Sequence, residues 1–398
     1  MESDLRSQDS NRPDMPDTDI RHDIPSDIDD LVTTEEEERI SVATQWQLMW
    51  WRFRKHKVAM VAAVILILFY MVVILANFLA YADPNDSEAQ RSLTPPQRVY
   101  FFDDGKFRPY VYELTGKRDM KTFKRVYTPT DKKIPIKLFA HGYTYKLLGK
   151  FRVDIHLIGV EGEGLTAENT IFLLGTDMLG RDLFSRLTLG TRMSMTIGLV
   201  GVTLSLTLGI LLGGLSGFYG GALDNFIQRL IEIVRSIPTI PLWMGLAAAL
   251  PSNWSVVQIY FAITIIISLI GWTGLARVVR GRFLALREED FVMAADLAGC
   301  SQMRIIFRHM VPSFLSHIIA ATTLAIPAMI ISETALSFLG LGLRPPAISW
   351  GVLLQDAQNV QTLAISPWLM ISAIPVIVAI LAYNFLGDGL RDAADPYG

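Results

Sequence analysis

The sequence predicts an all-α polytopic membrane protein with six transmembrane helices and a small β-rich insert between the first two. Of its 398 residues, 51% are hydrophobic and only 19% are charged, whereas about a quarter of the residues in a typical soluble chain are charged. The apolar residues are also gathered into blocks, and the loops between the blocks hold most of the charge. Together these observations exclude an ordinary soluble globular protein.

Five apolar blocks reach the roughly 20 residues that a helix needs to cross the hydrocarbon core of a bilayer. A sixth block is shorter, but the amphipathic run at 226–236 before it extends it. The five long blocks are 58–79, 193–218, 256–276, 312–343 and 366–386, and the short one is 237–250.

Basic residues near the ends of the spans predict the orientation, because cytoplasmic loops carry an excess of Lys and Arg. A dense basic cluster at 51–57 precedes the first span and should stay in the cytoplasm. With six spans, the arginine-rich segment 277–311 and the C-terminus are then cytoplasmic as well. The long loop between the first two spans is also basic, but loops of that length cross the membrane largely regardless of charge. We therefore expect both termini inside and this loop outside.

Four regions follow from this organisation. Residues 1–45 are expected to form a disordered acidic cytoplasmic tail, because the first 40 contain fourteen acidic residues and four arginines, too polar to bury a core. Residues 46–81 contain the basic segment and the first span, 82–170 the β-rich periplasmic insert, and 171–398 the remaining spans.

Short strand patterns predict the β structure of the insert. Residues 99–102 and 110–112 flank Asp104-Gly105, which is a strong hairpin signal. Residues 152–160 alternate in the same way. Cys300 is the only cysteine, so no intramolecular disulfide holds this insert together.

The cytoplasmic loop at 283–312 predicts two short helices joined by a sharp turn. An acidic start at 288–290 favours a helix through residue 298, and Gly299 is typical of a left-handed cap. The Ser301 side chain is expected to cap a second helix that reaches Pro312. Ala294, Ala295 and Ala298 give the first helix small side chains, so that another backbone could approach closely. An amphipathic surface helix without a partner is the alternative.

Within this loop, Ala294-Ala295, then Gly299, then Pro312 resemble the signature loop of binding-protein-dependent ABC importer permeases. In that family the loop forms a coupling helix that docks on a cytoplasmic ATPase. The sequence departs from the family at the leading acidic position, where Met293 stands, and at an apolar position, where His309 stands. The resemblance implies a type I importer permease fold, with Met293, Ala294, Ala295, Gly299 and Pro312 in the coupling loop.

Three further stretches resemble dipeptide and oligopeptide permeases. They are 175–182 with Ser185-Arg186 and 190–192, then 333–342 with Pro345-Pro346 and 349–351, and 384–392 with Asp395-Pro396. The resemblance covers the basic segment and first span, and then 171–398. It implies a second homologous permease, two cytoplasmic ABC ATPases and an extracytoplasmic binding protein as partners, in the inner membrane of a bacterium. ATP and magnesium would bind to the ATPases, with no cofactor on this chain. Peptides are the implied solute, and oligosaccharides or opines are the alternative.

Two groups of polar residues are candidate functional sites. Asp177, Gly180, Arg181 and Asp182 lie just before the second span, where an ion-pair network could hold a periplasmic gate; a structural turn that anchors the span is the alternative. Glu333 lies within an apolar block, and ionisable residues inside spans often line a pathway. The glycines of the second span are expected to serve close helix packing.

The sequence lacks the motifs that other classes of protein would require. The chain contains no phosphate-binding Gly-rich loop and no histidine pair with metal-ligand spacing, so neither catalysis nor a metal site is expected, and no nucleic-acid partner. A secondary transporter would need ion-coupling carboxylates near the middle of the membrane. A membrane receptor or scaffold would use the acidic tail and the insert as binding modules.

Overall fold

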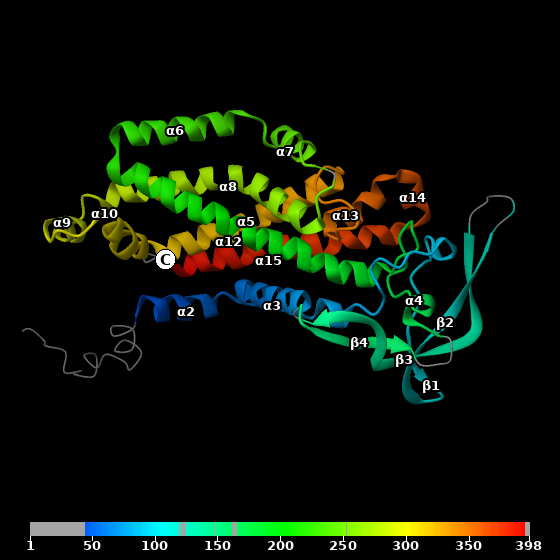
Figure 1. Cartoon of the computed structure of the whole chain (residues 1–398). Helices are drawn as coiled ribbons and strands as arrows, with labels where there is room; N and C mark the ends of the chain where they lie inside the picture. The colour runs from blue at the N-terminus through cyan, green and yellow to red at the C-terminus, as the bar shows by residue number, and fades with distance from the viewer. Residues whose placement is uncertain are drawn as a thin grey trace, which may run out of the picture. The chain divides into compact units, whose positions relative to one another are not determined.

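The computed structural model describes residues 44–394, except for 119, 121–124, 148, 161–164 and 252 and the side chains at 45, 316 and 317 (Figure 1). The chain divides into a unit of residues 1–48 and a unit of residues 49–398. Of the first unit only Thr44 and the start of helix α2 (Gln45–Lys55) are described; all the other elements belong to the second. The expected acidic tail and Asp395-Pro396 therefore lie outside the described residues, save for positions 44 and 45.

Five long apolar helices, each able to cross a membrane by length and composition, form most of the second unit. They coincide with the five long apolar blocks of the sequence. Helix α5 extends ten residues further toward the N-terminus than its block, because Asp182 caps it by accepting a hydrogen bond from the Ser185 N–H. The five are α3 (Lys57–Leu79), α5 (Leu183–Tyr219), α8 (Val256–Leu286), α12 (Leu315–Phe338) and α15 (Ala373–Ala394), the last preceded by the 3₁₀ turn η5 (Pro367–Ser372).

The sixth expected span is a bent pair of helices. Helices α6 (Gly221–Ser236) and α7 (Thr239–Ala248) meet at an angle of 84°. The break falls at Ile237 and Pro238, because proline lacks the N–H that continues a helix and disfavours helical geometry in the residue before it. Within the described part of the chain, the number of helices that could span a membrane is therefore five, or six if the bent pair is one span.

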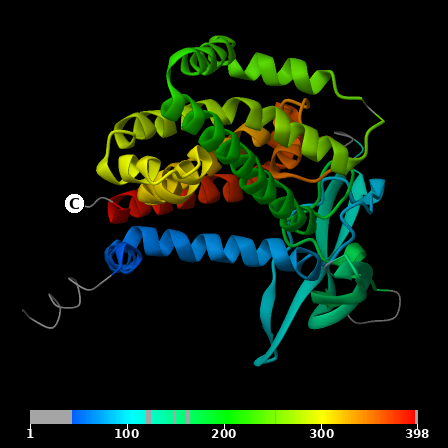
Figure 2. The same ribbon diagram turned by 60° about the vertical axis from the view of Figure 1, so that its left-hand side comes forward.

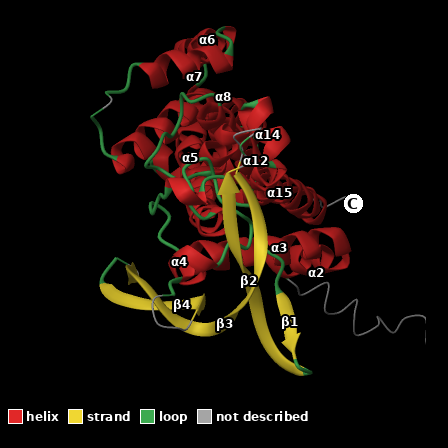
Figure 3. Cartoon of the chain, turned by 90° about the vertical axis from the view of Figure 1, so that its right-hand side faces the viewer, coloured by secondary structure: helices red, strands yellow, loops and turns green. Residues whose placement is uncertain are grey.

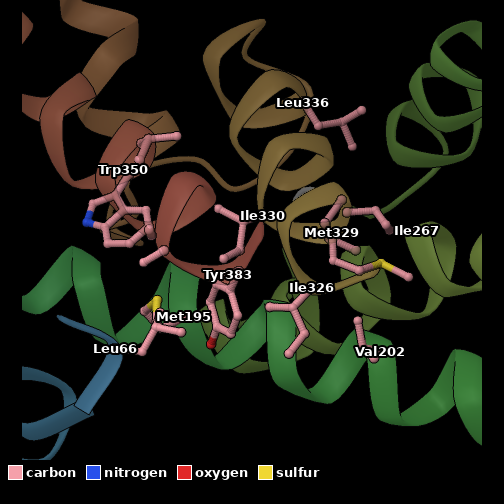
Figure 4. Close-up of a cluster of buried hydrophobic side chains, with 14 of the residues drawn as sticks. Leu66, Met195, Val202, Ile267, Ile326, Met329, Ile330, Leu336, Trp350 and Tyr383 are labelled. Carbon is pink, nitrogen blue, oxygen red and sulfur yellow. The ribbon is translucent and has the colours of Figure 1, made fainter. Parts of the chain in front are cut away.

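Helix α5 runs through the middle of the bundle and packs on α3, α8 and α12 (Figures 1 and 2). The core between these helices is built from aliphatic, methionine and aromatic side chains (Figure 4). Its members include Leu66, Met195, Val202, Ile267, Ile326, Met329, Ile330, Leu336, Trp350 and Tyr383.

Short elements gather at the two opposite ends of the bundle (Figure 1). One end holds the start of α3, the end of α15 and the elements between α8 and α12: α9 (Asp290–Leu297), α10 (Gln302–Arg304), the π-helical turn η3 (Ile305–Met310) and α11 (Val311–Ser313). The other end holds the β-rich insert with η2 (Ala89–Arg91) and α4 (Ala167–Thr170), together with α13 (Trp350–Gln355), η4 (Asp356–Gln358) and α14 (Val360–Ile365).

The described residues of the insert form four antiparallel strands in the order β1-β2-β3-β4 (Figure 3). The predicted hairpin is present, with Asp103 paired to Lys106 across a turn in which Asp104 and Gly105 both have positive φ. The predicted strand at 152–160 is β4. The longest strand, β3, was not recognised in the sequence. The strands are β1 (Tyr100–Asp103), β2 (Lys106–Arg118), β3 (Arg125–Leu147) and β4 (Phe151–Val160).

Candidate functional site

The loop between α8 and α12 forms the helix–turn–helix that the sequence predicts. Helix α9 ends at Leu297, and Gly299 follows with φ +74°. The Gly299 N–H donates to the Asp296 carbonyl at 2.9 Å, and the Cys300 N–H donates to the Ala295 carbonyl at 3.1 Å. These two bonds satisfy carbonyls that the end of a helix leaves free, and they need the left-handed residue that glycine supplies most easily.

The second arm of this loop is less regular than predicted. Ser301 stands at the N-cap position of α10, but its side chain accepts no capping hydrogen bond, so the predicted capping role of its hydroxyl is wrong. Beyond α10 the chain winds as the π-helical turn η3 before Pro312 in α11. Ile305, Ile306 and Met310 in this turn are fully or almost fully buried, which ties the arm to the bundle.

Helix α9 divides its side chains between the bundle and the outside. Val292 and Ala295 are 3% and 8% exposed and pack on the cluster that contains Phe283 of α8. Ala294, Met293 and the other residues of the outer face are exposed, with Leu297 at 89%. Of the small residues expected to admit another backbone, Ala295 therefore serves the chain's own core, whereas Ala294 and Ala298 face outward.

The turn before α5 holds a buried ion-pair cluster. Asp177 is 1% exposed and accepts hydrogen bonds from the Arg181 side chain (Nε, 2.6 Å) and from the Leu179 and Arg181 backbone N–H groups. Arg186, 2% exposed, approaches the same carboxylate at 3.4 Å and donates to the Pro84 carbonyl. The cluster thus joins the turn, the first turn of α5 and the segment that follows α3.

Gly180 allows the close approach that this turn requires. It has φ +79°, and a Cβ at this position would lie 2.1 Å from the Glu88 carbonyl oxygen. Backbone atoms cannot move aside as a flexible side chain can, so only glycine fits here. Opposite the turn, the Trp368 indole N–H donates to the Thr176 carbonyl at 3.1 Å. The predicted residues do come together, and the contacts are those of an anchoring turn.

Asp182 does not belong to the ion pairs. Its carboxylate accepts hydrogen bonds from the Tyr81 hydroxyl and the Ser185 N–H, both at 2.7 Å. Burial raises the pKa of Asp182 to about 6, although both hydrogen bonds oppose this shift. Burial likewise raises the pKa of Tyr81.

We expect the free energy of unfolding to fall with rising pH because of Asp182. Its folded pKa of about 6 lies above the usual pKa of an unfolded aspartate, so the folded protein holds the Asp182 proton more tightly than the unfolded chain does. The resulting contribution to the free energy of unfolding is fully present below about pH 4 and is lost as the pH rises through 6. Between about pH 4.5 and 7.5 the loss should be about 2 kcal/mol. Denaturant unfolding of the full chain in detergent measures it.

The matched variant for this prediction is Asp182→Asn, which keeps the helix cap but cannot ionise. It should flatten the pH dependence by about 2 kcal/mol over the same range. Asp356 also has a pKa raised by burial and gives a pH dependence of the same sign that remains in the variant. An unchanged slope in Asp182→Asn would refute the assignment.

Glu333 lies at the centre of a buried hydrogen-bond network. It is 0% exposed and accepts hydrogen bonds from Ser337 (2.8 Å) and Ser194 (3.2 Å). The Trp350 backbone N–H in turn donates to the Ser194 hydroxyl, and the Trp350 indole N–H donates to Thr191. Glu333 therefore holds α12, α5 and α13 together, and within this chain its carboxylate borders other side chains rather than an open channel.

Sequence reasoning missed several members of these networks. Arg186 and Trp350 lie in stretches that resemble peptide permeases, but neither their role in these networks nor that of Ser194 was predicted, because their partners lie about 10 to 150 residues away in the chain. It also missed the Asp224–Arg280 pair, in which the Arg280 guanidinium donates twice to the carboxylate, at 2.6 and 2.5 Å, and fixes α6 to α8. Among the described residues no group of His, Cys, Asp and Glu side chains is arranged to hold a metal ion.

The apolar bundle and its two polar ends define a polytopic membrane protein. Residues 206–397 match the family described as binding-protein-dependent transport system inner membrane component, and residues 44–96 match the N-terminal transmembrane domain of oligopeptide transport permease C. The chain is 40% identical to the oligopeptide transport system permease protein OppC of Haemophilus influenzae over 223 residues, which are 56% of this chain and 69% of that protein. It is 35% identical to the dipeptide transport system permease protein DppC of Bacillus subtilis over 224 residues, 56% of this chain and 68% of that protein.

A structure of the MetNI methionine ABC transporter aligns with 52% of this chain and 96% of its own, at 17% identity and a TM-score of 0.40, which is too low to add to the assignment. The chain belongs to the family of binding-protein-dependent transport system inner membrane components. It is a multi-pass permease subunit of an ATP-binding-cassette importer, as its sequence motifs predicted.

Proposed function

We propose that this chain forms half of a translocation pathway for peptides, with a second homologous permease as the other half. Two of its relatives are named as oligopeptide and dipeptide transport permeases, and these names support the solute class. The observation that carries the mechanism is the exposed apolar helix α9, bent back at Gly299 at one end of the bundle.

The outer face of α9 has the chemistry of a docking surface. Phe291 and Leu297 are large, apolar and 41% and 89% exposed, while Ala294 and Ala298 between them allow a close approach of a facing backbone. A short helix of this kind suits a groove in a partner that buries its apolar face. The proposed partner is a cytoplasmic ABC ATPase, one on each permease.

The inner face of α9 provides the connection through which a movement of the ATPase would reach the membrane. Val292 and Ala295 pack with Phe283 near the end of α8 and with Ile306 in η3. Because packed interiors transmit displacement rather than absorb it, closure of the two ATPases would shift α8 and α12 together. The pathway would then change from one open side to the other as a two-state switch.

The remaining partners follow from the same arrangement. ATP and magnesium would bind to the ATPases, since this chain has no phosphate-binding loop. The end of the bundle that carries α9 would face the cytoplasm, with both termini, in a bacterial inner membrane. An extracytoplasmic binding protein would deliver the peptide at the opposite end, where the β-rich insert and α14 lie.

Leu297→Glu tests the docking surface. Leu297 is 89% exposed and packs little within the chain, and glutamate is a good helix former, so the variant should fold and insert normally. A carboxylate in an apolar interface is left unpaired and costs several kcal/mol. We expect co-purification of the ATPase with the tagged permease to fall at least about tenfold, and uptake to fall with it.

Val360→Glu is the matched control. Val360 is 78% exposed on the helix α14 at the opposite end of the bundle (Figure 1), and this variant should retain the ATPase. Normal co-purification and normal uptake in Leu297→Glu would show that the ATPase docks elsewhere. If Leu297→Glu kept the ATPase but lost uptake, Leu297 would be needed to transmit the movement of the ATPase and not to dock it.

A further inference from the structure

The β3–β4 hairpin lies against the last turns of α3, where that apolar helix ends. The His156 ring approaches the Asn77 carbonyl through Nδ1 at 3.1 Å and the Tyr143 carbonyl through Nε2 at 2.8 Å. The rings of Phe78 and Phe139 are 6.0 Å apart. Figure 3, seen along the helices, shows that the hairpin projects sideways from the bundle. The hairpin is therefore held beside a membrane span at the level where the span ends.

Large apolar side chains are exposed both on this hairpin and at the end of α3. Leu138, Phe139 and Phe151 are large and apolar, and they are 59%, 66% and 65% exposed. On α3 itself Ile74, one turn before the end of the helix, is 63% exposed. The Phe139 ring lies beside Phe78 at the end of α3, and exposed aromatic and aliphatic side chains next to a span are well placed to enter the interfacial layer of a bilayer.

The tip of the hairpin concentrates positive charge without a counterion. Lys146 and Arg152 are directly opposite each other on β3 and β4, and Lys150 lies in the turn between them. None of the three forms an ion pair with a described residue, and the segment 146–152 contains no acidic residue. Like charges at paired positions repel each other, so this tip gains stability when an anion binds between them.

We propose that the β3–β4 hairpin is a lipid-binding element that places Phe139 and Phe151 in the interfacial layer of the bilayer and Lys146, Lys150 and Arg152 on the phosphates of anionic phospholipids. Long basic side chains bury their methylene groups and extend their charge to the headgroups, and clustered basic residues attract anionic lipid. This placement satisfies the apolar residues and the charges of the hairpin at once, because a bilayer surface offers both chemistries within one side-chain length.

The single native cysteine makes a direct test possible. In the full chain with Cys300→Ser, Phe151→Cys is labelled with a small fluorophore and reconstituted in nanodiscs that contain phosphatidylcholine spin-labelled near the headgroup. We expect strong quenching of the fluorophore. The matched control is Phe102→Cys, because Phe102 is 67% exposed on β1. Strand β1 lies beyond the end of α3 (Figure 1), so the label should be quenched several-fold less.

The charge contribution is tested in the same discs. Adding phosphatidylglycerol should increase quenching at residue 151, and the triple variant Lys146→Gln, Lys150→Gln, Arg152→Gln should lose this increase while keeping the quenching in phosphatidylcholine alone. Equal quenching at 102 and 151, or none at 151, would overturn the proposal. Protection of residue 151 from both lipid spin label and aqueous iodide, seen only when a partner permease is present, would overturn it in favour of a protein contact.

Discussion

Asp177→Ala is expected to lower the free energy of unfolding by about 3–5 kcal/mol. The substitution leaves Arg186 and Arg181 in the protein interior without their common carboxylate, and an uncompensated buried charge is far more costly than the loss of a surface pair. It also removes the acceptor of the two backbone N–H groups that close the turn. Denaturant unfolding of the full chain in detergent measures the change.

Glu232→Ala is the matched control for this effect. Glu232 pairs with Arg229 at 2.6 Å, the same distance that joins Asp177 to Arg181, but both side chains are more than half exposed. Exposed pairs contribute about 0–1 kcal/mol, so this control measures what is lost when a pair of the same length lies at the surface. Similar losses in both variants would contradict the assignment of a buried ion-pair cluster.

Asp177→Ala also distinguishes the two roles considered for the turn before α5, an anchor and a gate. As an anchor of α5, the turn should lose stability when Asp177 is removed, and uptake should fall because less folded protein is present. As a gate, it should keep its stability and allow ATP hydrolysis without substrate. The contacts from this turn to the Pro84 carbonyl and to Trp368 favour the anchor.

Gly213→Leu is expected to destabilise the bundle by about 3 kcal/mol or more and to abolish uptake. A Cβ at this position of α5 would lie 2.4 Å from the Ala276 carbonyl oxygen of α8. Since the neighbour is backbone, the two helices must separate, and they can do so only by breaking the packing at Gly217, where a Cβ would meet the Arg280 carbonyl at 2.7 Å. Small residues that let helix backbones approach are the usual basis of close packing in membranes.

The control for Gly213→Leu is Gly281→Leu on α8. A Cβ at Gly281 meets no atom within 4 Å, and leucine has a higher helix propensity than glycine, so this variant should be neutral or slightly more stable. Thermal unfolding in detergent and uptake in proteoliposomes compare the two. If both variants behave alike, the glycines of α5 do not act through contact with α8.

Much of this fold follows from local sequence. Five spans could be predicted because about 20 apolar residues in a row have few stable arrangements other than a membrane helix. The bend at Gly299 and the turn at Asp104-Gly105 were also predicted correctly, since both depend on positive φ angles that few residues adopt without cost. In each case a short stretch of chain contains the whole physical cause.

Other features could not be predicted from short stretches. Strand β3 carries many charged residues and two prolines, at 129 and 135, and only pairing with β2 and β4 makes it a strand. The π-helical turn before Pro312 and the missing cap at Ser301 likewise depend on how the second arm of the loop packs on the bundle. These elements take their form from contacts with distant segments.

By itself the sequence determined the five long apolar helices, the family and the glycine bend after α9, because apolar length and glycine turns act within a few residues. Only the tertiary structure decided which charges are buried together, that Glu333 joins three helices rather than lining an opening within this chain, and that a basic hairpin lies beside the end of α3. The physical reason is that burial and ion pairing depend on which distant segments meet, and the folded chain alone brings those segments together.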